Sequence, residues 1–147
     1  MPILSAQTIR ARKILYPCEE KFKRYGMSGG LGSASYDVTV AQTFWVWPGR
    51  FKLASTLEQF TMPRNVCGVV HDKSTWARRG LAVQNTFLDP GWKGFLTLEL
   101  TFHSFWIYRI KKGTPIAQIV FHELDQETEI PYEGKYQDQE AGPQKPR

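Results

Sequence analysis

Short runs of β-branched and aromatic residues, each ending at a turn signal, are the feature that most limits what this chain can fold into. The runs extend from 36–41 (YDVTVA) through 51–60 (FKLASTLEQF) to 115–124 (PIAQIVFHEL). Turn-forming residues separate them, among them Pro48 and Gly49 and the segment 111–113 (KKG). This spacing predicts an all-β fold, a sandwich or barrel with one or two short helices.

Two segments near the N-terminus are expected to contribute no strands. Residues 5–14 (SAQTIRARKI) begin with a candidate capping serine and carry Ile9 and Ile14 among basic residues, which indicates a short amphipathic helix. Residues 26–35 hold four of the chain's twelve glycines, so we expect a loop there. The segment lacks the GKS/T ending of a phosphate-binding loop.

Length and composition indicate one folded domain spanning residues 1–147. Of these 147 residues 41% are hydrophobic and 14% aromatic, which is enough for a substantial core. No apolar run reaches the length of a membrane span and the N-terminus lacks a signal peptide's apolar centre, so we expect no membrane partner and a cytoplasmic location, the host cytoplasm if the source is viral. Cys18 and Cys67 are too few and too isolated for a disulfide framework or a CxxC metal site, so both are expected to be reduced.

The formal net charge of +5 favours anionic partners. Those partners are nucleotide phosphates or nucleic acid. The basic residues are scattered along the chain and form no recognised nucleic-acid module, so we expect a nucleotide. A non-catalytic basic β-domain that binds nucleic acid is the alternative from another functional class.

Residues 72–80 (DKSTWARRG) carry helix start and stop signals, with hydroxyl or carboxylate caps first, basic residues in the last turn and a final glycine. They predict a two-turn helix. Ser74 and Arg78 are four residues apart and share a face of that helix, with Ser74 near its free backbone N–H groups. This arrangement favours an anion, and phosphate is the obvious one.

Two carboxylates follow this helix. Asp89 opens the turn Asp-Pro-Gly-Trp after a strand predicted at 81–83, which makes it accessible at a strand end, although a turn-forming role alone also explains it. Residues 95–102 (FLTLELTF) alternate strictly between leucine-rich and mixed faces. Glu99 is therefore a carboxylate on a partly apolar face, or else a charge on a solvated strand face.

The last segment, residues 130–147 (IPYEGKYQDQEAGPQKPR), is nearly devoid of aliphatic residues. We expect it to be mobile unless something orders it. Four of its side chains are suited to hydrogen bonding with a phosphate chain: Tyr132, Lys135, Tyr136 and Gln139. A solvated tail is the simpler interpretation.

Six segments in this order resemble the superfamily of trimeric dUTPases and dCTP deaminases, and they are most similar to a compact, phage-like form of the deaminase branch. The resemblance covers roughly residues 33–147. The matching segments are SASYDV, FKLASTLEQFTMP, DKSTWARRGL, DPGWKGFLTLEL, GTPIAQIVF and PYEGKYQDQ followed by GP.

The resemblance implies a distorted jelly-roll that assembles as a homotrimer, with active sites between subunits and a C-terminal segment (residues 130–147) that closes over the nucleotide. Mg²⁺ would accompany the triphosphate. Ser74 and Arg78 match the family's triphosphate-binding helix, with Thr75 between them. Asp89 matches the sugar-side aspartate and Glu99 the catalytic glutamate of the deaminases. In the tail, the residues that match the family's contacts to the nucleotide are Tyr132, Lys135 and Gln139.

Deamination of cytosine at C4 needs an attacking water and a group that takes its proton and passes it on, which one carboxylate can do. Glu99 is that candidate. Zinc-dependent cytidine deaminases carry an HxE and PCxxC signature. The three histidines and two cysteines of this chain supply no such set. Any deamination is therefore expected to be zinc-free.

One departure from the deaminase pattern concerns the base pocket. Only Phe87 and Leu88 stand between Thr86 and Asp89, about two residues fewer than in the deaminases compared, and Gln84 and Asn85 are the candidates to read the base edge instead. The first hypothesis is a dCTP deaminase that makes dUTP and ammonia and further cleaves the product to dUMP and pyrophosphate if bifunctional. The alternative enzyme is a dUTP diphosphatase in which Asp89 orients the attacking water.

Overall fold

The computed structural model describes residues 2–84 and 86–147. It contains two short helices and twelve strands. The helices are α1 (Ala6–Arg12) and α2 (Ser74–Ala77). The strands are β1 (Leu15–Tyr16), β2 (Phe22–Arg24), β3 (Met27–Leu31), β4 (Tyr36–Thr39), β5 (Phe44–Val46), β6 (Phe51–Thr61), β7 (Val66–Asp72), β8 (Leu81–Val83), β9 (Phe87–Leu88), β10 (Lys93–Phe102), β11 (Tyr108–Ile110) and β12 (Pro115–Glu123). The all-β prediction with one or two short helices is confirmed.

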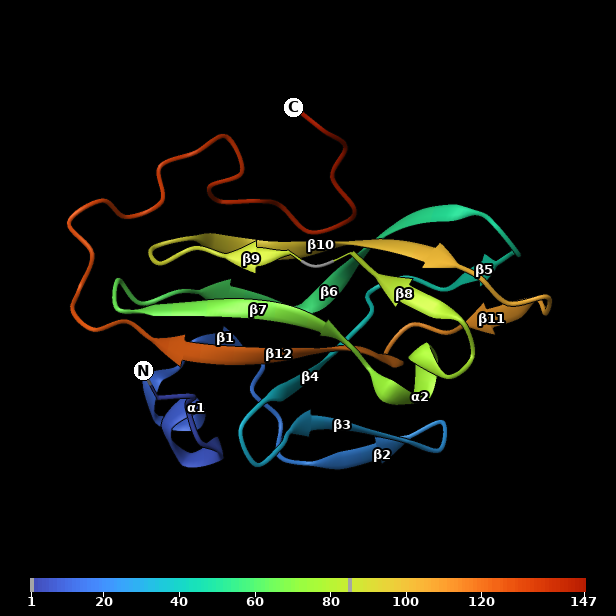
Figure 1. The fold of residues 1–147 in the computed structure, drawn as a ribbon, viewed down its shortest axis with the longest axis horizontal. Coiled ribbons are helices and arrows are strands. Elements are labelled where there is room, and N and C mark those ends of the chain that lie inside the picture. The colour runs from blue at the N-terminus through green and yellow to red at the C-terminus, as the bar shows by residue number, and fades with distance from the viewer. Residues whose placement is uncertain (1, 85) are drawn as a thin grey trace.

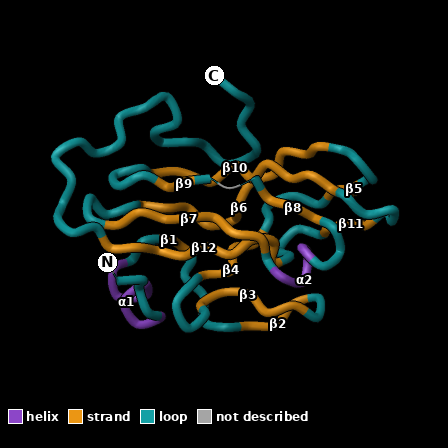
Figure 2. Tube along the Cα trace, viewed as in Figure 1, coloured by secondary structure: helices purple, strands orange, loops and turns teal. Residues whose placement is uncertain are grey.

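The strands form three antiparallel sheets (Figures 1 and 2). A six-stranded sheet has the order β2-β3-β4-β12-β7-β9, and a four-stranded sheet has the order β1-β6-β10-β8. The pair β11-β5 forms a separate ribbon. A bridge between Val40 and Thr56 joins the two larger sheets, and their buried leucine, isoleucine, valine and phenylalanine side chains share one core. This is an all-β architecture of the jelly-roll type.

Strand β10 has the alternation that the sequence predicts. Leu96, Leu98 and Leu100 are at most 4% exposed, whereas Glu99 on the opposite face is partly exposed. A β-bulge between Phe95 and Thr97 interrupts its pairing with β6, and the hydroxyl of Thr56 accepts the Leu96 N–H at 3.1 Å. The bulge keeps the backbone hydrogen bonded while re-aiming the side chains that follow.

The loop expected at residues 26–35 is wrong, because residues 22–31 form the β2-β3 hairpin. Tyr25 and Gly26 make its turn with φ values of 52° and 74°. Within β3 the glycines serve close packing, since a Cβ on Gly29 would lie 2.4 Å from the Phe22 ring. The glycines here therefore allow β3 to pack closely against the Phe22 ring.

The helix expected at 72–80 is present as α2, but it is a single turn and its expected side-chain caps are wrong. Lys73 occupies the N-cap position, and no side chain caps the helix. The Asp72 carboxylate instead accepts the Val83 N–H at 2.6 Å. The buried Lys73 ammonium pairs with Asp37 at 2.7 Å. The Asp72 carboxylate, which the local pattern assigned to capping, thus makes a tertiary contact instead.

The helix expected at 5–14 is confirmed as α1, with Ile9 buried beneath it. Ser5 stands at the N-cap, although its hydroxyl contacts that of Thr8 at 3.1 Å. Both cysteines are free thiols. Among the helices described, none has the length and apolarity needed to cross a membrane.

Candidate active site

Glu99 and Asp89 line the same cavity, of about 360 Å³, although they come from different elements. Glu99 lies on β10, and Asp89 follows β9 at the start of a turn. The other lining residues come from strands β6, β9 and β10, from the positions just before β9 and β10, and from the tail: Phe51, Leu53, Thr86, Phe87, Leu88, Trp92, Leu96, Thr97, Tyr132, Tyr136, Gln139, Gln144, Lys145 and Pro146. Glu99 and Asp89 are the two carboxylates among them.

The Glu99 side chain is held by Thr86, whose hydroxyl donates to Oε2 at 3.1 Å. The same strand position is fixed through the backbone, because the Glu99 carbonyl accepts the Gln84 N–H at 2.9 Å. A carboxylate with one oxygen engaged by a hydroxyl presents its other oxygen in a defined direction. This is the arrangement that a general acid-base group needs.

Asp89 owes its position to the turn that it opens. The Trp92 N–H donates to the Asp89 carbonyl at 3.1 Å, and Gly91 takes a φ of 85° that favours glycine. The turn also buries the Trp92 ring and sends its Nε1–H to the Tyr136 carbonyl at 2.8 Å. The turn-forming role and the place at the cavity are therefore both present in Asp89.

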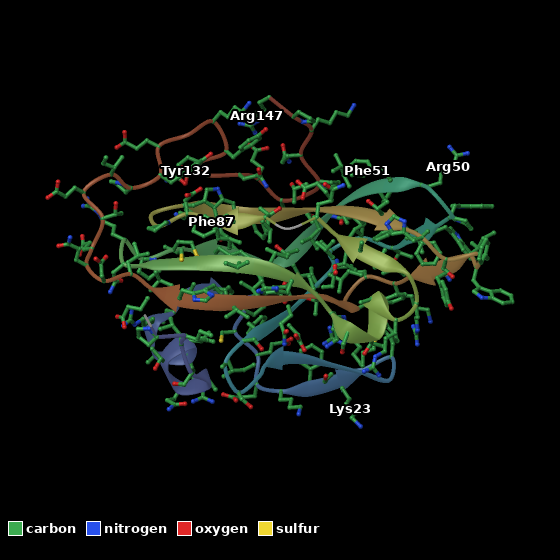
Figure 3. The ribbon with its side chains drawn as sticks, in the orientation of Figure 1. Lys23, Arg50, Phe51, Phe87, Tyr132 and Arg147 are labelled. Atoms are coloured by element: carbon green, nitrogen blue, oxygen red, sulfur yellow. The ribbon has the colours of Figure 1, made fainter. Side chains whose placement is uncertain are left out.

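Aromatic rings make much of the cavity wall. Figure 3 shows Phe51, Phe87 and Tyr132 on the side of the molecule that the tail covers, and all three line the cavity. Flat apolar walls with a few polar groups are typical of small-molecule sites and fit a planar base. Sequence reasoning missed Phe51, Phe87 and Trp92 as lining residues, because an aromatic residue in an apolar stretch of sequence looks the same whether it faces a core or a ligand. The sequence singled out Tyr136 as a hydrogen-bonding group, and it lines the cavity.

The tail, residues 130–147, folds back along β10 and covers the cavity (Figure 1). Gln139 is buried, and its amide donates to the Phe95 carbonyl at 2.7 Å and to the Thr97 hydroxyl at 3.0 Å. Tyr132 lines the cavity, whereas Lys135 is exposed, lies outside it and places its ammonium 5.3 Å from the Tyr136 ring centroid. In this conformation Gln139 anchors the tail, and Lys145 is the tail cation at the cavity.

The residues expected to bind the triphosphate lie away from the cavity that holds Glu99. Ser74, Thr75 and Arg78 do not line the cavity that holds Glu99. Arg78 borders a second cavity of about 350 Å³, together with Arg79, Gly80, Ser104, Trp106 and Tyr108. Gln84 is exposed, and Asn85 lies outside the described residues. One chain therefore separates the candidate phosphate contacts from the candidate catalytic carboxylates.

A third carboxylate, Glu58, is almost fully buried away from both cavities, and sequence reasoning missed it. Its two oxygens accept the Thr39 N–H at 3.1 Å, and Oε1 also accepts the Thr39 hydroxyl at 2.8 Å. Burial raises the pKa of Glu58 to about 7 despite these hydrogen bonds. Within residues 2–84 and 86–147, no group of three or more His, Cys, Asp or Glu could hold a metal ion.

Comparison with proteins of known name identifies the family of this chain. Residues 35–124 match the family model described as dCTP deaminase-like. A dCTP deaminase of Campylobacter concisus (strain 13826) is 32% identical over 163 aligned positions, which cover 88% of this chain and 88% of that protein. A dCTP deaminase of Acinetobacter baumannii (strain AYE) is 44% identical over 95 positions, covering 63% of this chain and half of that protein's length.

Several solved structures that resemble this fold are dUTPases. The native EIAV dUTPase has a TM-score of 0.62 at 20% identity, over 83% of this chain and 97% of that one. A mutant dUTPase from phage phi11 of S. aureus, solved for its coordination of a structural Mg(II) ion, has a TM-score of 0.60 at 15% identity, over 81% and 92%. At these identities the likeness shows the fold alone. Together, the match of residues 35–124 and the 32% identity across 88% of the chain show that this protein belongs to the dCTP deaminase-like family and is an enzyme of that kind.

Proposed function

We propose that this enzyme removes the 4-amino group of dCTP by hydrolysis without zinc, giving dUTP and ammonia. The observation that carries the proposal is Glu99, which stands on the wall of an aromatic cavity with one carboxylate oxygen bonded to Thr86. The relatives' names support the same reaction.

In the proposed mechanism, Glu99 accepts a proton from water as the water oxygen bonds to C4 of the base. The carboxylate passes this proton to the ring nitrogen N3, which keeps it in the product, and then carries the second proton from the new C4 hydroxyl to the departing amine as the C4 carbonyl forms. The C4–N4 bond breaks, ammonia leaves and the base keeps the new oxygen. One dCTP and one water thus give one dUTP and one ammonia, and Glu99 ends in its starting state.

We treat Mg²⁺ as part of the substrate, carried on the triphosphate oxygens. Mg²⁺ usually keeps several waters and takes one or two carboxylates together with substrate phosphates. The described chain fits that mode, because Asp89 and Glu99 line the cavity but no larger cluster of metal ligands exists in its described residues. Arg78, Ser74 and Thr75 would bind the remaining phosphate oxygens of the triphosphate.

We propose a homotrimer with active sites shared between subunits. Arg78 on α2 and Glu99 on β10 line different cavities of one chain, so both can serve one nucleotide only if α2 comes from a neighbouring copy. Closed cyclic assembly provides such a contact three times over. The tail would then open and reclose over the bound nucleotide, with Tyr132 at the cavity and Lys135 turning toward the phosphates.

The second candidate activity is cleavage of dUTP to dUMP and pyrophosphate, either after deamination or in its place. The fold supports it, since two solved structures that resemble this chain are a dUTPase of EIAV and one of phage phi11. Asp89 would orient water for attack on phosphorus in that reaction.

The test is to incubate the purified enzyme with dCTP and, separately, with dUTP in the presence of Mg²⁺, and to resolve products by chromatography. We expect dUTP or dUMP from dCTP, with ammonia released. Formation of dUMP from dUTP alone, with dCTP untouched, would replace the deaminase by a dUTP diphosphatase. Treatment with a zinc chelator should leave the rate unchanged, and loss of activity restored by zinc would contradict the zinc-free mechanism.

A further inference from the structure

The tail pairs with the first half of one edge of strand β10. Strand β6 pairs with the other edge along nearly its whole length, whereas β8 pairs only with residues 100–102. The first half of the β8 edge therefore presents backbone N–H and C=O groups that need other partners. The tail supplies them through a parallel bridge between Gly94 and Gln139, in which the Phe95 N–H donates to the Gln139 carbonyl at 3.0 Å (Figure 1).

The Gln137 side chain extends this pairing toward the start of β10. Its Oε1 accepts the Lys93 N–H at 2.8 Å, and its Nε2 donates to the Gly91 carbonyl at 2.9 Å. In a parallel ladder, one residue bonds the N–H and the C=O on either side of the residue opposite to it. The Gln137 amide makes these two bonds on either side of Trp92, so a side chain takes the place of a backbone peptide group.

The contacts of the Gln137 amide require a glutamine. Besides the bond to Gly91, Nε2 donates to the Tyr132 carbonyl at 3.2 Å, so the nitrogen faces two acceptors and the oxygen faces the Lys93 N–H donor. This pattern fixes which amide atom is nitrogen and which is oxygen. A side chain of the same length without a donor and an acceptor would lose all three bonds.

The turn that Gln137 contacts is fixed to the sheets from its other side. The Gly91 N–H donates to the carbonyl of Met62, directly after β6, at 3.2 Å. The Met62 N–H in turn donates to the Trp92 carbonyl at 2.8 Å. The turn therefore keeps its place whether or not the tail is present, and the tail is the part that docks.

We propose that Gln137 is a positioning residue for the reaction: its amide holds the tail on β10 and thereby keeps Tyr132 and Gln139 at the cavity. Gln137 itself lies outside the cavity lining. The inference rests on the proposed function, because it concerns closure of the nucleotide site. The cavity is formed with the tail docked, so the docked state is the one competent to bind. KM should therefore vary inversely with the docked fraction of the free enzyme.

The kinetic test compares Gln137→Ala and Gln137→Met with the wild type, using dCTP, or dUTP if that is the substrate. Both variants lose three hydrogen bonds, and methionine keeps the length without adding charge. KM should rise by about ten-fold or more, while kcat at saturating nucleotide stays within about two-fold because bound nucleotide restores docking. Glu99→Gln should show the opposite split, with kcat lowered and KM kept. The matched control is Glu140→Ala, which removes an exposed side chain from the same tail and should keep both wild-type values.

Trypsin cleavage after the exposed Lys135 measures docking without catalysis, because the docked tail bonds the next residue through the Tyr136 carbonyl. A protease acts on the opened fraction, so cleavage should be about ten-fold faster in both Gln137 variants than in the wild type and Glu140→Ala.

Three results would overturn the proposal: wild-type cleavage in Gln137→Met, faster cleavage with an unchanged KM, or equal changes in Glu140→Ala. A wild type that acts on neither dCTP nor dUTP would instead refute the proposed function, and the cleavage rates would still show whether Gln137 docks the tail.

Discussion

Glu99 combines the two properties that its proposed role requires: access to the cavity and a fixed orientation. Thr86 supplies the orientation through one carboxylate oxygen, and the backbone of β10 holds the position. Asp89 reaches the same cavity from a turn, without sharing that hydroxyl. Two carboxylates in one cavity with different supports are suited to different steps.

Glu99→Gln should abolish most deamination while leaving nucleotide binding intact. Glutamine keeps the size and the hydrogen bond from Thr86 but cannot accept and return a proton, so turnover on dCTP should fall by roughly 10² to 10⁴. Steady-state kinetics with a binding titration measures both quantities. Asp89→Asn is the matched carboxylate control, and any dUTP cleavage should fall much more in it. Deamination near the wild-type rate in Glu99→Gln would refute the mechanism.

Arg78→Ala should raise the KM for the nucleotide with little effect on stability. Its guanidinium is exposed and can hold phosphate oxygens in bidentate fashion. Arg79 is a suitable comparison in the same turn, because its guanidinium carbon lies 5.0 Å from the Trp76 ring centroid and 5.7 Å from that of Tyr108. We expect Arg79→Ala to lower the melting temperature more and the nucleotide affinity less. An unchanged KM in Arg78→Ala would remove this residue from the site.

Glu58 should make the folded state less stable as the pH rises. Burial raises its pKa from an ordinary value of 4.5 to about 7, so the folded protein holds a proton that the unfolded chain releases. The free energy of unfolding should therefore fall between about pH 4.5 and pH 7 and level off above it, by at most about 3 kcal/mol. Glu58→Gln should remove this component, so urea titrations at pH 5 and pH 8 should differ less in the variant. An identical pH dependence in both proteins would contradict it.

The tail acts at the scale of an element, because it closes the cavity without belonging to a sheet. A single bridge joins it to β10, between Gly94 and Gln139. Backbone contact is close there, since a Cβ on Gly94 would lie 2.6 Å from the Gln139 nitrogen. Hydrogen bonds from Gln139 to Phe95 and Thr97, together with that from Trp92 to the Tyr136 carbonyl, hold the tail at this short distance.

Truncation after Ile130 should leave the core folded and nearly inactive. The tail supplies Tyr132, Gln139 and Lys145 to the cavity wall, and its loss opens the site to water. Gly94→Ala tests the same idea with the tail present, because the added methyl group should displace Gln139 and lower activity in the same direction. Activity assays with circular dichroism would measure both effects. Full activity of the truncated enzyme would show that the tail has no catalytic part.

The whole molecule should be a homotrimer, with a sedimentation mass three times the chain's 16.9 kDa. Mixing subunits tests whether sites are shared: Glu99→Gln and Arg78→Ala proteins, each impaired when assayed alone at a substrate concentration below the KM of Arg78→Ala, should regain activity when unfolded and refolded together. Random assembly would place an intact Glu99 beside an intact Arg78 from the neighbour in about a quarter of the sites. A stable, active monomer, or a mixed trimer without activity, would contradict the shared site.

The local sequence pattern was sufficient to predict elements whose structure depends on adjacent residues. The alternation at 95–102 predicted β10 and placed Glu99 opposite the leucines, because side chains on a strand alternate whatever it pairs with. The Asp-Pro-Gly-Trp turn likewise predicted an accessible Asp89, because turn geometry depends on a few adjacent residues. Family resemblance then added the roles of these two residues, which spacing alone left open.

Only the tertiary structure decided which distant residues meet. Glu99, Asp89 and the tail share a cavity, and Arg78 lies apart from them, because long-range strand pairing and the docking of the tail set those distances. The burial of Glu58 and the strand formed by Gly29 and Gly30 have the same origin. By itself the sequence determined what each segment prefers, since preference arises from neighbours along the chain. Partners in space depend on how the sheets pack, and no short stretch of sequence contains that information.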